Sequence, residues 1–294
     1  MSGFLIILTG ALVACSCALL GSFLVLRRMA MIGDAISHAV LPGIVLAFLI
    51  SGSRDSMFML LGASVVGLIT VFLIQSFKQS GVQSDASIGV VFTSLFAVGI
   101  VLVSVYTSQI DLDLDCVLYG EITYIPFQTV SLLGLPELPK ALLMISFTLL
   151  ICLVVIGLFY KQFKLCSFDP ALAAALGIPV AFFHYLLMGL VSMTTVASFE
   201  SVGAILVVGM LIVPAATAYL LVDSLARMIG VSMAIGVLCS VLGYFAAAWL
   251  DASIAGCMVS VAGMLFVIAF LFSPSHGVLW KRIRMRKLAL NASE

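Results

Sequence analysis

Near its start the chain reads GFLIILTGALVACSCALLGSFLVL (residues 3–26), an uninterrupted run without a charged side chain. As an α-helix with a rise of about 1.5 Å per residue, this run is roughly 36 Å long and exceeds the roughly 30 Å thickness of a bilayer's hydrocarbon core. Similar apolar runs recur along the chain. They are continuous and do not alternate with polar residues, so they predict membrane helices and not the strands of a membrane barrel.

The composition extends this pattern to the whole chain. Of its 294 residues, 64% are hydrophobic and only 9% are charged, and the mean hydropathy is +1.32. Soluble domains are about half apolar and about a quarter charged. We therefore expect an all-α, polytopic integral membrane protein in which residues 1–294 form one transmembrane domain.

Nine segments are long and apolar enough to be predicted as membrane-spanning helices. They are residues 3–26, 29–50, 57–77, 86–107, 140–160, 180–199, 202–222, 228–250 and 255–273. The two segments on either side of Glu200 could instead form one bent or broken unit, so eight spans remain an alternative to nine.

The basic residues predict the orientation. If the turn at Arg27 and Arg28 is cytoplasmic, most of the 13 lysines and arginines fall on that side. The cytoplasmic set is Arg27, Arg28, Lys78, Lys161, Lys164, Arg227, Lys281, Arg282, Arg284, Arg286 and Lys287. Only Arg54 and Lys140 fall outside. The positive-inside rule then places the N-terminus outside and the C-terminus inside, with residues 274–294 as a basic cytoplasmic tail.

The predicted outer side is acidic. Five of its carboxylates lie between the fourth and fifth spans: Asp111, Asp113, Asp115, Glu121 and Glu137. A negative mouth concentrates cations near its entrance. Because solvated loops are often charged, an ordinary surface loop remains the alternative.

The stretch GDAISHAVLPG (residues 33–43) puts a carboxylate and an imidazole into an apolar helix. Asp34 and His38 are four residues apart and share one helix face. Pro42 has no N–H, so the carbonyl oxygen of His38 loses its usual helical partner. A carboxylate, an imidazole and a freed carbonyl suit a divalent ion such as Mn²⁺, Fe²⁺ or Zn²⁺. The alternative is structural: Asp34 caps the helix and His38 bonds to a neighbouring helix.

Two further polar residues are less decisive. Glu200 could contribute a carboxylate from a second helix, but a polar turn on the outer side is the favoured interpretation. His184 follows an inner loop, where a structural hydrogen bond is the more common role. The sequence leaves open whether either residue contacts a metal.

The inner loop FKLCSFDPALAAALGIP (residues 163–179) contains a short predicted helix. Asp169 followed by Pro170 is a helix start, with a cap and then a proline at the first position. Gly177 ends the helix and Pro179 prevents its continuation. A short alanine-rich helix at the cytoplasmic face fits a groove on a partner protein. An ordinary amphipathic surface helix is the alternative.

Several kinds of site are missing from the sequence. It contains no GxxxxGK[ST], so the chain is not expected to bind ATP through a P-loop. HExxH, GxSxG and CxxC are also absent, and no enzyme activity is predicted. The basic tail follows the last helix and is interpreted as a topological anchor at the membrane, not as a nucleic-acid site.

Taken together, several stretches resemble one family, the permease subunits of bacterial ABC importers for manganese, zinc and iron(II). The stretches are RRMAMIGDAISHAVLPG, SDASIGVVFTSLFAVGIVLVS, DLDCVLYGEI, SFDPALAAALGIPV and HYLLMGLVSMTTVASFESVGAILVVGMLIVPAATAYL. The resemblance runs from about Leu26 to Pro274, in the same order and with similar gaps.

The resemblance implies a role for particular residues. Asp34 and His38 match the metal ligands of the family. The coupling helix that contacts the ATPase corresponds to the loop of residues 163–179, with Asp169, Pro170, Ala174, Leu176, Gly177, Ile178 and Pro179 as its matching positions.

It also implies partners. Family permeases form homodimers in the bacterial inner membrane, where they work with two copies of a separate ATPase and one extracytoplasmic metal-binding protein. No permanently bound cofactor is expected, because the metal is cargo. The competing hypothesis is a proton-coupled secondary metal transporter in which Asp34 and His38 relay protons. The sequence does not identify the metal.

Overall fold

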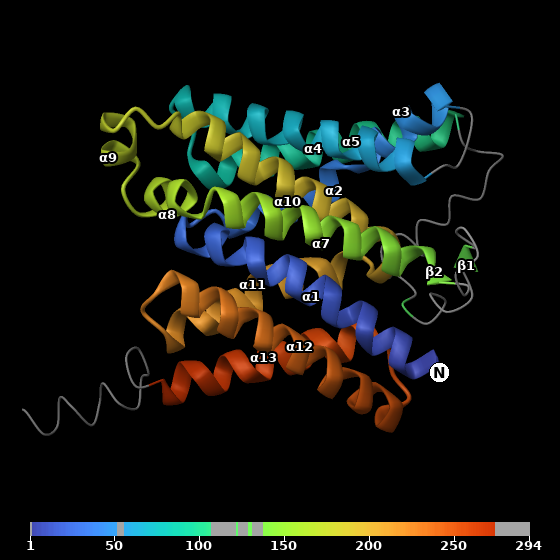
Figure 1. The fold of residues 1–294 in the computed structure, drawn as a ribbon. Helices are drawn as coiled ribbons and strands as arrows, with labels where there is room; N and C mark the ends of the chain where they lie inside the picture. The colour runs from blue at the N-terminus through green and yellow to red at the C-terminus, as the bar shows by residue number, and fades with distance from the viewer. Residues whose placement is uncertain (1, 52–55, 107–121, 123–128, 131–137, 274–294) are drawn as a thin grey trace, which may run out of the picture.

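The computed structural model describes residues 2–51, 56–106, 122, 129–130 and 138–273, and this part of the chain is almost entirely helical (Figure 1). The helices are α1 (Ser2–Leu26), α2 (Ala30–Ala39), α3 (Leu41–Ser51), α4 (Ser56–Gln79), α5 (Ser84–Tyr106), α7 (Lys140–Leu158), α8 (Tyr160–Phe168), α9 (Pro170–Ala175), α10 (Val180–Val202), α11 (Ala204–Leu221), α12 (Leu225–Leu250) and α13 (Ile254–Phe272). Two short strands, β1 (Thr129–Val130) and β2 (Leu138–Pro139), pair antiparallel.

Within the described residues, nine segments are long and apolar enough to span a bilayer, with α2 and α3 together forming one of them. The prediction of a polytopic helical membrane protein is therefore confirmed. The spans run between two ends of the molecule, one carrying α8 and α9 and the other carrying β1 and β2 (Figure 1).

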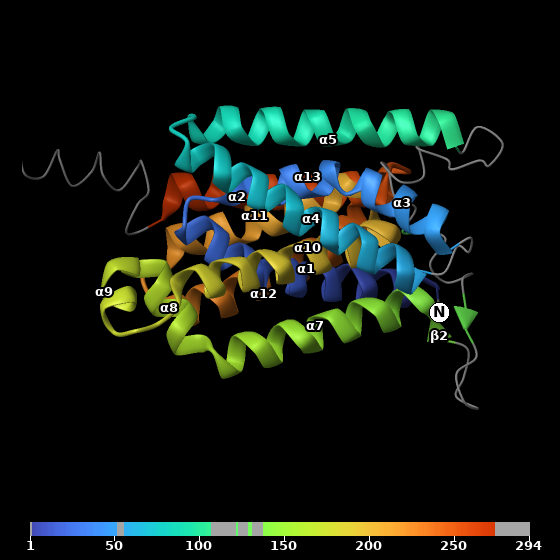
Figure 2. The same ribbon diagram turned by 90° about the horizontal axis from the view of Figure 1, so that it is seen from above.

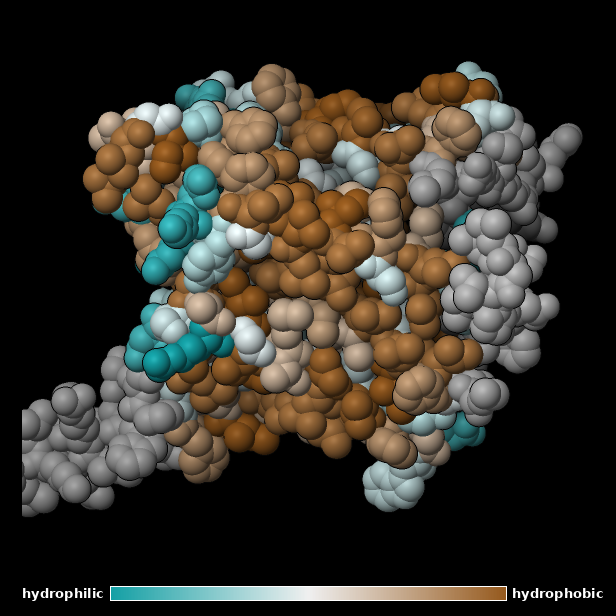
Figure 3. Space-filling model, viewed as in Figure 1, coloured by the Kyte–Doolittle hydropathy of each residue, from teal (hydrophilic) through white to brown (hydrophobic). Residues whose placement is uncertain are grey.

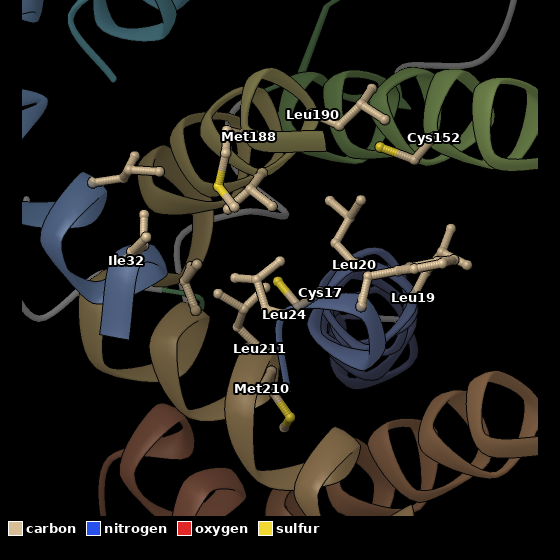
Figure 4. Packing of buried hydrophobic residues seen from close by; sticks show 14 of the residues in the cluster. Cys17, Leu19, Leu20, Leu24, Ile32, Cys152, Met188, Leu190, Met210 and Leu211 are labelled. Atoms are coloured by element: carbon tan, nitrogen blue, oxygen red, sulfur yellow. The ribbon is translucent and has the colours of Figure 1, made fainter. Parts of the chain in front are cut away.

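Helix α1 lies at the centre of the bundle. It packs against α11 and α12 on one side and against α7 and α10 on the other. Figure 2 shows α5 and α7 at opposite edges of the molecule. Residues of α1 such as Cys17, Leu20 and Leu24 are buried, and they lie in a cluster with residues of α2, α7, α10 and α11 (Figure 4).

The outer surface is apolar across the middle of the bundle. Brown residues cover most of the visible face in Figure 3, and hydrophilic residues gather at the end that carries α8. Large side chains such as Leu158, Phe245 and Trp249 are exposed. A continuous exposed apolar surface around a helical bundle is expected where lipid takes the place of water.

The span predicted at residues 29–50 is divided at Val40. Helix α2 ends at Ala39 and α3 begins at Leu41, because Pro42 has no N–H to donate to the carbonyl of His38. Across the break, the N–H groups of Gly43 and Ile44 both donate to the Val40 oxygen, at 2.9 and 3.1 Å. The residue four positions after His38 is Pro42, which cannot donate to the His38 oxygen.

The prediction that Glu200 lies in a turn is wrong, because α10 continues through this position to Val202. The helix ends at Gly203, whose φ of 78° and ψ of 166° are readily adopted only by glycine. Helix α11 starts at the next residue. Over the described residues this break favours nine spans over eight.

Candidate functional site

Helix α2 brings the two predicted metal ligands together. Nε2 of His38 lies 3.6 Å from Oδ1 of Asp34, one helical turn away, and the side chains are 32% and 34% exposed. Neighbouring residues of the same helix, including Ile32, Ala35 and Ile36, are buried. One face of α2 therefore anchors the helix in the bundle, and the Asp34–His38 pair remains accessible to an ion.

Two aromatic side chains of α5 surround the imidazole. The ring centroids of Phe92 and Phe96 lie 5.9 and 6.0 Å from that of His38. These rings restrict the orientations that the imidazole can adopt, and they reduce its contact with solvent. Neither phenylalanine was predicted from the sequence to lie at the site, although their spacing of four residues puts both on one face of α5.

The position of α2 depends on a close helix contact just beyond the pair. A Cβ added to Gly43 of α3 would lie 2.7 Å from the carbonyl oxygen of Gly62 in α4, and a Cβ on Gly62 would lie 2.7 Å from the Gly43 oxygen. Only glycine permits this approach of the two backbones. The Pro42–Gly43 pair thus both frees the His38 carbonyl and fixes the next helix against α4.

One copy of the chain supplies few ligands. No group of three or more His, Cys, Asp or Glu side chains is arranged to hold a metal among the residues that the structure describes. His184 is not brought into such a group with Asp34 and His38. Its Nε2 is buried without a hydrogen-bond partner in the described structure, so the expected structural bond is not found there. The side chain of Glu200 lies outside the described residues.

Helix α9 forms as the sequence predicts. Oδ1 of Asp169 accepts a hydrogen bond from the backbone N–H of Leu172 at 2.9 Å, and Pro170 occupies the first helical position. At the other end Gly177 has a φ of +77°. The N–H groups of Gly177 and Ile178 donate to the carbonyls of Ala174 and Ala173, both at 3.0 Å, which is the usual glycine-terminated helix end.

The segment before α9 differs from the prediction. Residues 160–168 form helix α8, whereas the sequence analysis placed a loop from residue 163. Phe163 and Cys166 of α8 are buried while Lys161 and Lys164 face solvent. Phe163 and Cys166 are three residues apart with polar residues around them, a pattern that indicates a short amphipathic helix.

Helices α8 and α9 lie together at one end of the bundle (Figure 1), where three large apolar side chains are exposed. Phe168, Leu172 and Leu176 are 58%, 47% and 65% exposed. Ala173 is fully buried and anchors α9 against its neighbours. A small exposed apolar patch on an anchored helix is suited to docking a protein partner.

Two predicted regions lie outside the described residues. They are the acidic segment with Asp111, Asp113, Asp115 and Glu121, and the basic tail of residues 274–294.

Comparisons with known proteins identify the family. Residues 4–273 match the model of the ABC 3 transport family. The chain is 54% identical over 279 residues to the manganese transport system membrane protein MntD of Bacillus subtilis, covering 95% of each chain. It is 41% identical over 287 residues to the zinc transport system membrane protein TroD of Treponema pallidum, covering 97% of this chain and 78% of the relative.

A solved structure agrees with these relatives. The fold matches PsaBC from Streptococcus pneumoniae, determined in complex with a Fab, with a TM-score of 0.79 and 35% identity over 96% of this chain and 94% of that one. The match extends over nearly the whole bundle. The chain is therefore a multi-pass membrane protein that belongs to the ABC 3 transport family.

Proposed function

We propose that this chain is the membrane permease of an ATP-driven importer of divalent transition-metal ions in the bacterial inner membrane. The observation that carries the proposal is the Asp34–His38 pair, which places a carboxylate 3.6 Å from an imidazole within a membrane-spanning segment. Ionisable side chains are costly within a bilayer and generally mark a pathway. Membership of a transport family supports the same conclusion.

Manganese is the proposed cargo. The relative that is 54% identical is named as a manganese transport protein, whereas the zinc transport protein is 41% identical. The chemistry of the pair is compatible, because carboxylate and carbonyl oxygens with one imidazole suit Mn²⁺. Zn²⁺ and Fe²⁺ are the competing ions in the test below.

A second copy of the chain completes the site in this proposal. One copy provides only the carboxylate and imidazole of α2, and these are partly exposed. Two copies facing each other across a dimer interface would supply two of each. A site of few ligands, without a closed cage, can bind an ion transiently and still release it, as transport requires.

Energy is supplied by a separate ATPase. This chain has no P-loop sequence, so in the proposal two ATPase copies contact the apolar surface of Phe168, Leu172 and Leu176. An extracytoplasmic binding protein delivers the ion at the opposite end of the bundle. This arrangement matches the predicted orientation, in which the end with α8 and α9 is cytoplasmic.

The proposed transport cycle assigns each part a task. The delivered ion passes to the Asp34–His38 pairs at the dimer interface, where Phe92 and Phe96 hold each imidazole in position. Nucleotide binding and hydrolysis in the ATPase move α9, and the bundle then changes which side the ion can reach. The ion leaves on the ATPase side because the pair holds it with few bonds.

The test measures cellular Mn, Zn and Fe together in metal-starved bacteria that express the importer with its ATPase and binding protein. A rise in Mn alone with the parent chain, absent in His38→Ala at equal expression, supports the proposal. Equal metal content in both strains would show that His38 is structural.

A reconstituted system separates the importer from a proton-coupled transporter. The permease is placed in proteoliposomes with and without its ATPase, and Mn²⁺ uptake is followed. Uptake at the full rate without the ATPase, driven by a proton gradient, would overturn the importer in favour of the secondary transporter.

A further inference from the structure

A hydrogen bond joins the turn after α1 to the last turn of α8. Nε of Arg27 donates to Oγ of Ser167 at 2.9 Å, and this hydroxyl donates in turn to the carbonyl of Phe163 at 2.7 Å. Arg27 is partly buried, and its Nη2 has no hydrogen-bond partner among the described residues. The bond to Ser167 therefore restrains the Arg27 guanidinium, whose Nη2 makes no hydrogen bond in the described part of the chain.

Each end of this bond lies next to a functional element. Ser167 comes two residues before Asp169, which caps α9. On the other side, α2 begins at Ala30, three residues after Arg27, and carries Asp34 and His38. The bond is thus a short connection between the coupling helix and the helix with the metal ligands.

The turn between Arg27 and α2 is closed by backbone hydrogen bonds. The N–H of Met29 donates to the Leu24 oxygen at 2.9 Å, and the N–H of Arg28 donates to the Val25 oxygen at 3.1 Å. Arg28 has a φ of 56°, the left-handed conformation that ends a helix in this way. Because the turn is short and closed, a displacement of Arg27 is passed on to the start of α2.

Aromatic packing holds α8 on the same side. The ring of Phe163 lies 5.8 Å from that of Phe23 in α1 and 5.4 Å from that of Phe183 in α10. Phe23 and Phe163 are both fully buried. The aromatic contacts hold the first half of α8 at Phe163, and the Arg27–Ser167 hydrogen bond holds its last turn.

The end of α8 also borders an open cavity. It has a volume of about 560 Å³ and lies between the ends of α1 and α8 and the turn from α11 to α12, with Ser167, Phe168, Asp223 and Leu225 in its wall. The end of α8 is therefore bonded to the turn after α1 and also faces the open space between α1 and α12. A displacement of α9 by the partner therefore has space in which to occur, and the Arg27–Ser167 hydrogen bond is a direct connection from α8 to the turn before α2.

We propose that Arg27 is a positioning residue that transmits movement of α9, through Ser167, to α2 and its metal ligands. The inference rests on the proposed function, since it assumes that an ATPase moves α9. Arg27 touches no metal ion in this account. Its loss is expected to leave metal binding intact and to separate ATP hydrolysis from transport.

The experiment uses the full complex with its ATPase in proteoliposomes, and it measures the number of Mn²⁺ ions imported per ATP hydrolysed. The variants are Arg27→Ala, Arg27→Lys, Ser167→Ala and the double alanine variant. A hydrogen bond from a charged group is strong enough for a change of about tenfold. We expect the ratio to fall about tenfold in Arg27→Ala and Ser167→Ala, and no further in the double variant. Arg27→Lys is expected to fall less than Arg27→Ala, because it keeps the charge.

Two matched variants control for nonspecific effects. Arg227→Ala removes an exposed arginine in the first turn of α12, and Ser76→Ala removes an exposed hydroxyl that bonds to its own helix at 2.9 Å. Both are expected to keep the parent ratio. Mn²⁺ binding to each purified permease, without ATP, is expected to match that of the parent chain.

The outcomes separate the inference from the proposed function. If the parent chain imports no metal with ATP, the proposed function fails and the inference fails with it. If the parent imports Mn²⁺ and the folded variants keep its ratio within twofold, only the inference is overturned. Should Arg27→Ala fail to accumulate in the membrane, Ser167→Ala and Arg27→Lys decide by the same ratio.

Discussion

The carboxylate of Asp169 caps helix α9 by accepting a hydrogen bond from the N–H of Leu172 at 2.9 Å. The helix has only six residues, and so short a helix has little stability of its own. The cap therefore contributes a large share of what keeps α9 formed. It also fixes the positions of the exposed Leu172 and Leu176, which form part of the surface proposed to contact the ATPase.

The first prediction concerns this cap. Replacing Asp169 by Ala is expected to cost about 1 kcal/mol of local helix stability and to weaken ATPase binding by about fivefold to tenfold. Asp169→Ser keeps a capping oxygen and is expected to retain most of the affinity. Binding of the purified ATPase to permease in nanodiscs measures both variants. Equal, strong binding by Asp169→Ala would show that α9 is not the docking element.

The second prediction concerns the proposed ligands. Asp34→Asn preserves the shape of the side chain but removes its charge, and His38→Ala removes the imidazole. Each is expected to weaken Mn²⁺ binding more than about tenfold, since even changes behind a ligand often cost that much. Isothermal titration of Mn²⁺ into the purified permease is the measurement.

A control on the same helix is available for the ligand variants. Met31 of α2 is 57% exposed, and Met31→Ala is expected to leave the affinity unchanged. If Asp34→Asn and His38→Ala also bind Mn²⁺ as the parent does, the pair is structural and the pathway lies elsewhere.

Much of the fold could be predicted because its signals are local. Long apolar runs identify the spans, since a bilayer admits little else. The cap at Asp169, the proline after it and the glycine at 177 determine a helix through neighbouring residues alone. The spacing of Asp34 and His38 likewise required only that their segment be helical.

Other features depended on information that is not local. Glu200 is helical because the helix break comes three residues later, at Gly203. The residues around Gly203 do not indicate that this glycine adopts an unusual backbone conformation. Helix α8 was missed because it is short and half polar, and the burial of Phe163 against α1 and α10 stabilises it. The bond between Arg27 and Ser167 joins residues 140 positions apart, and no pattern in one sequence indicates such a pair.

The third prediction concerns the contact between α3 and α4. Gly43→Ala is expected to destabilise the protein by about 1–3 kcal/mol, the usual cost of overpacking. The reason is that the new Cβ would lie 2.7 Å from the Gly62 oxygen and 2.9 Å from Cγ2 of Val66. Thermal unfolding in detergent, compared with the parent, measures the change.

A matched glycine variant tests whether that loss is specific. A Cβ on Gly89 in α5 meets nothing within 4 Å, so Gly89→Ala is expected to have no destabilising effect. An unfolding temperature for Gly43→Ala equal to that of Gly89→Ala would mean that α3 and α4 can separate without cost.

The last prediction uses Cys166 as a reporter of α8. This thiol is 5% exposed, and burial raises its pKa above the ordinary cysteine value, although the nearby Arg27 charge acts in the opposite direction. A raised pKa means that less thiolate, the reactive form, is present at any given pH below it.

In a chain whose other cysteines are replaced, we expect Cys166 to react with a maleimide much more slowly than an exposed cysteine introduced by Leu172→Cys. Its rate should continue to rise at alkaline pH where the exposed thiol has reached its plateau. Rates followed by mass spectrometry across a pH series provide the comparison. Equal rates with equal pH dependence would show that Cys166 is readily exposed to the reagent. The packing of Phe163 against α1 and α10 would then not hold α8 in place.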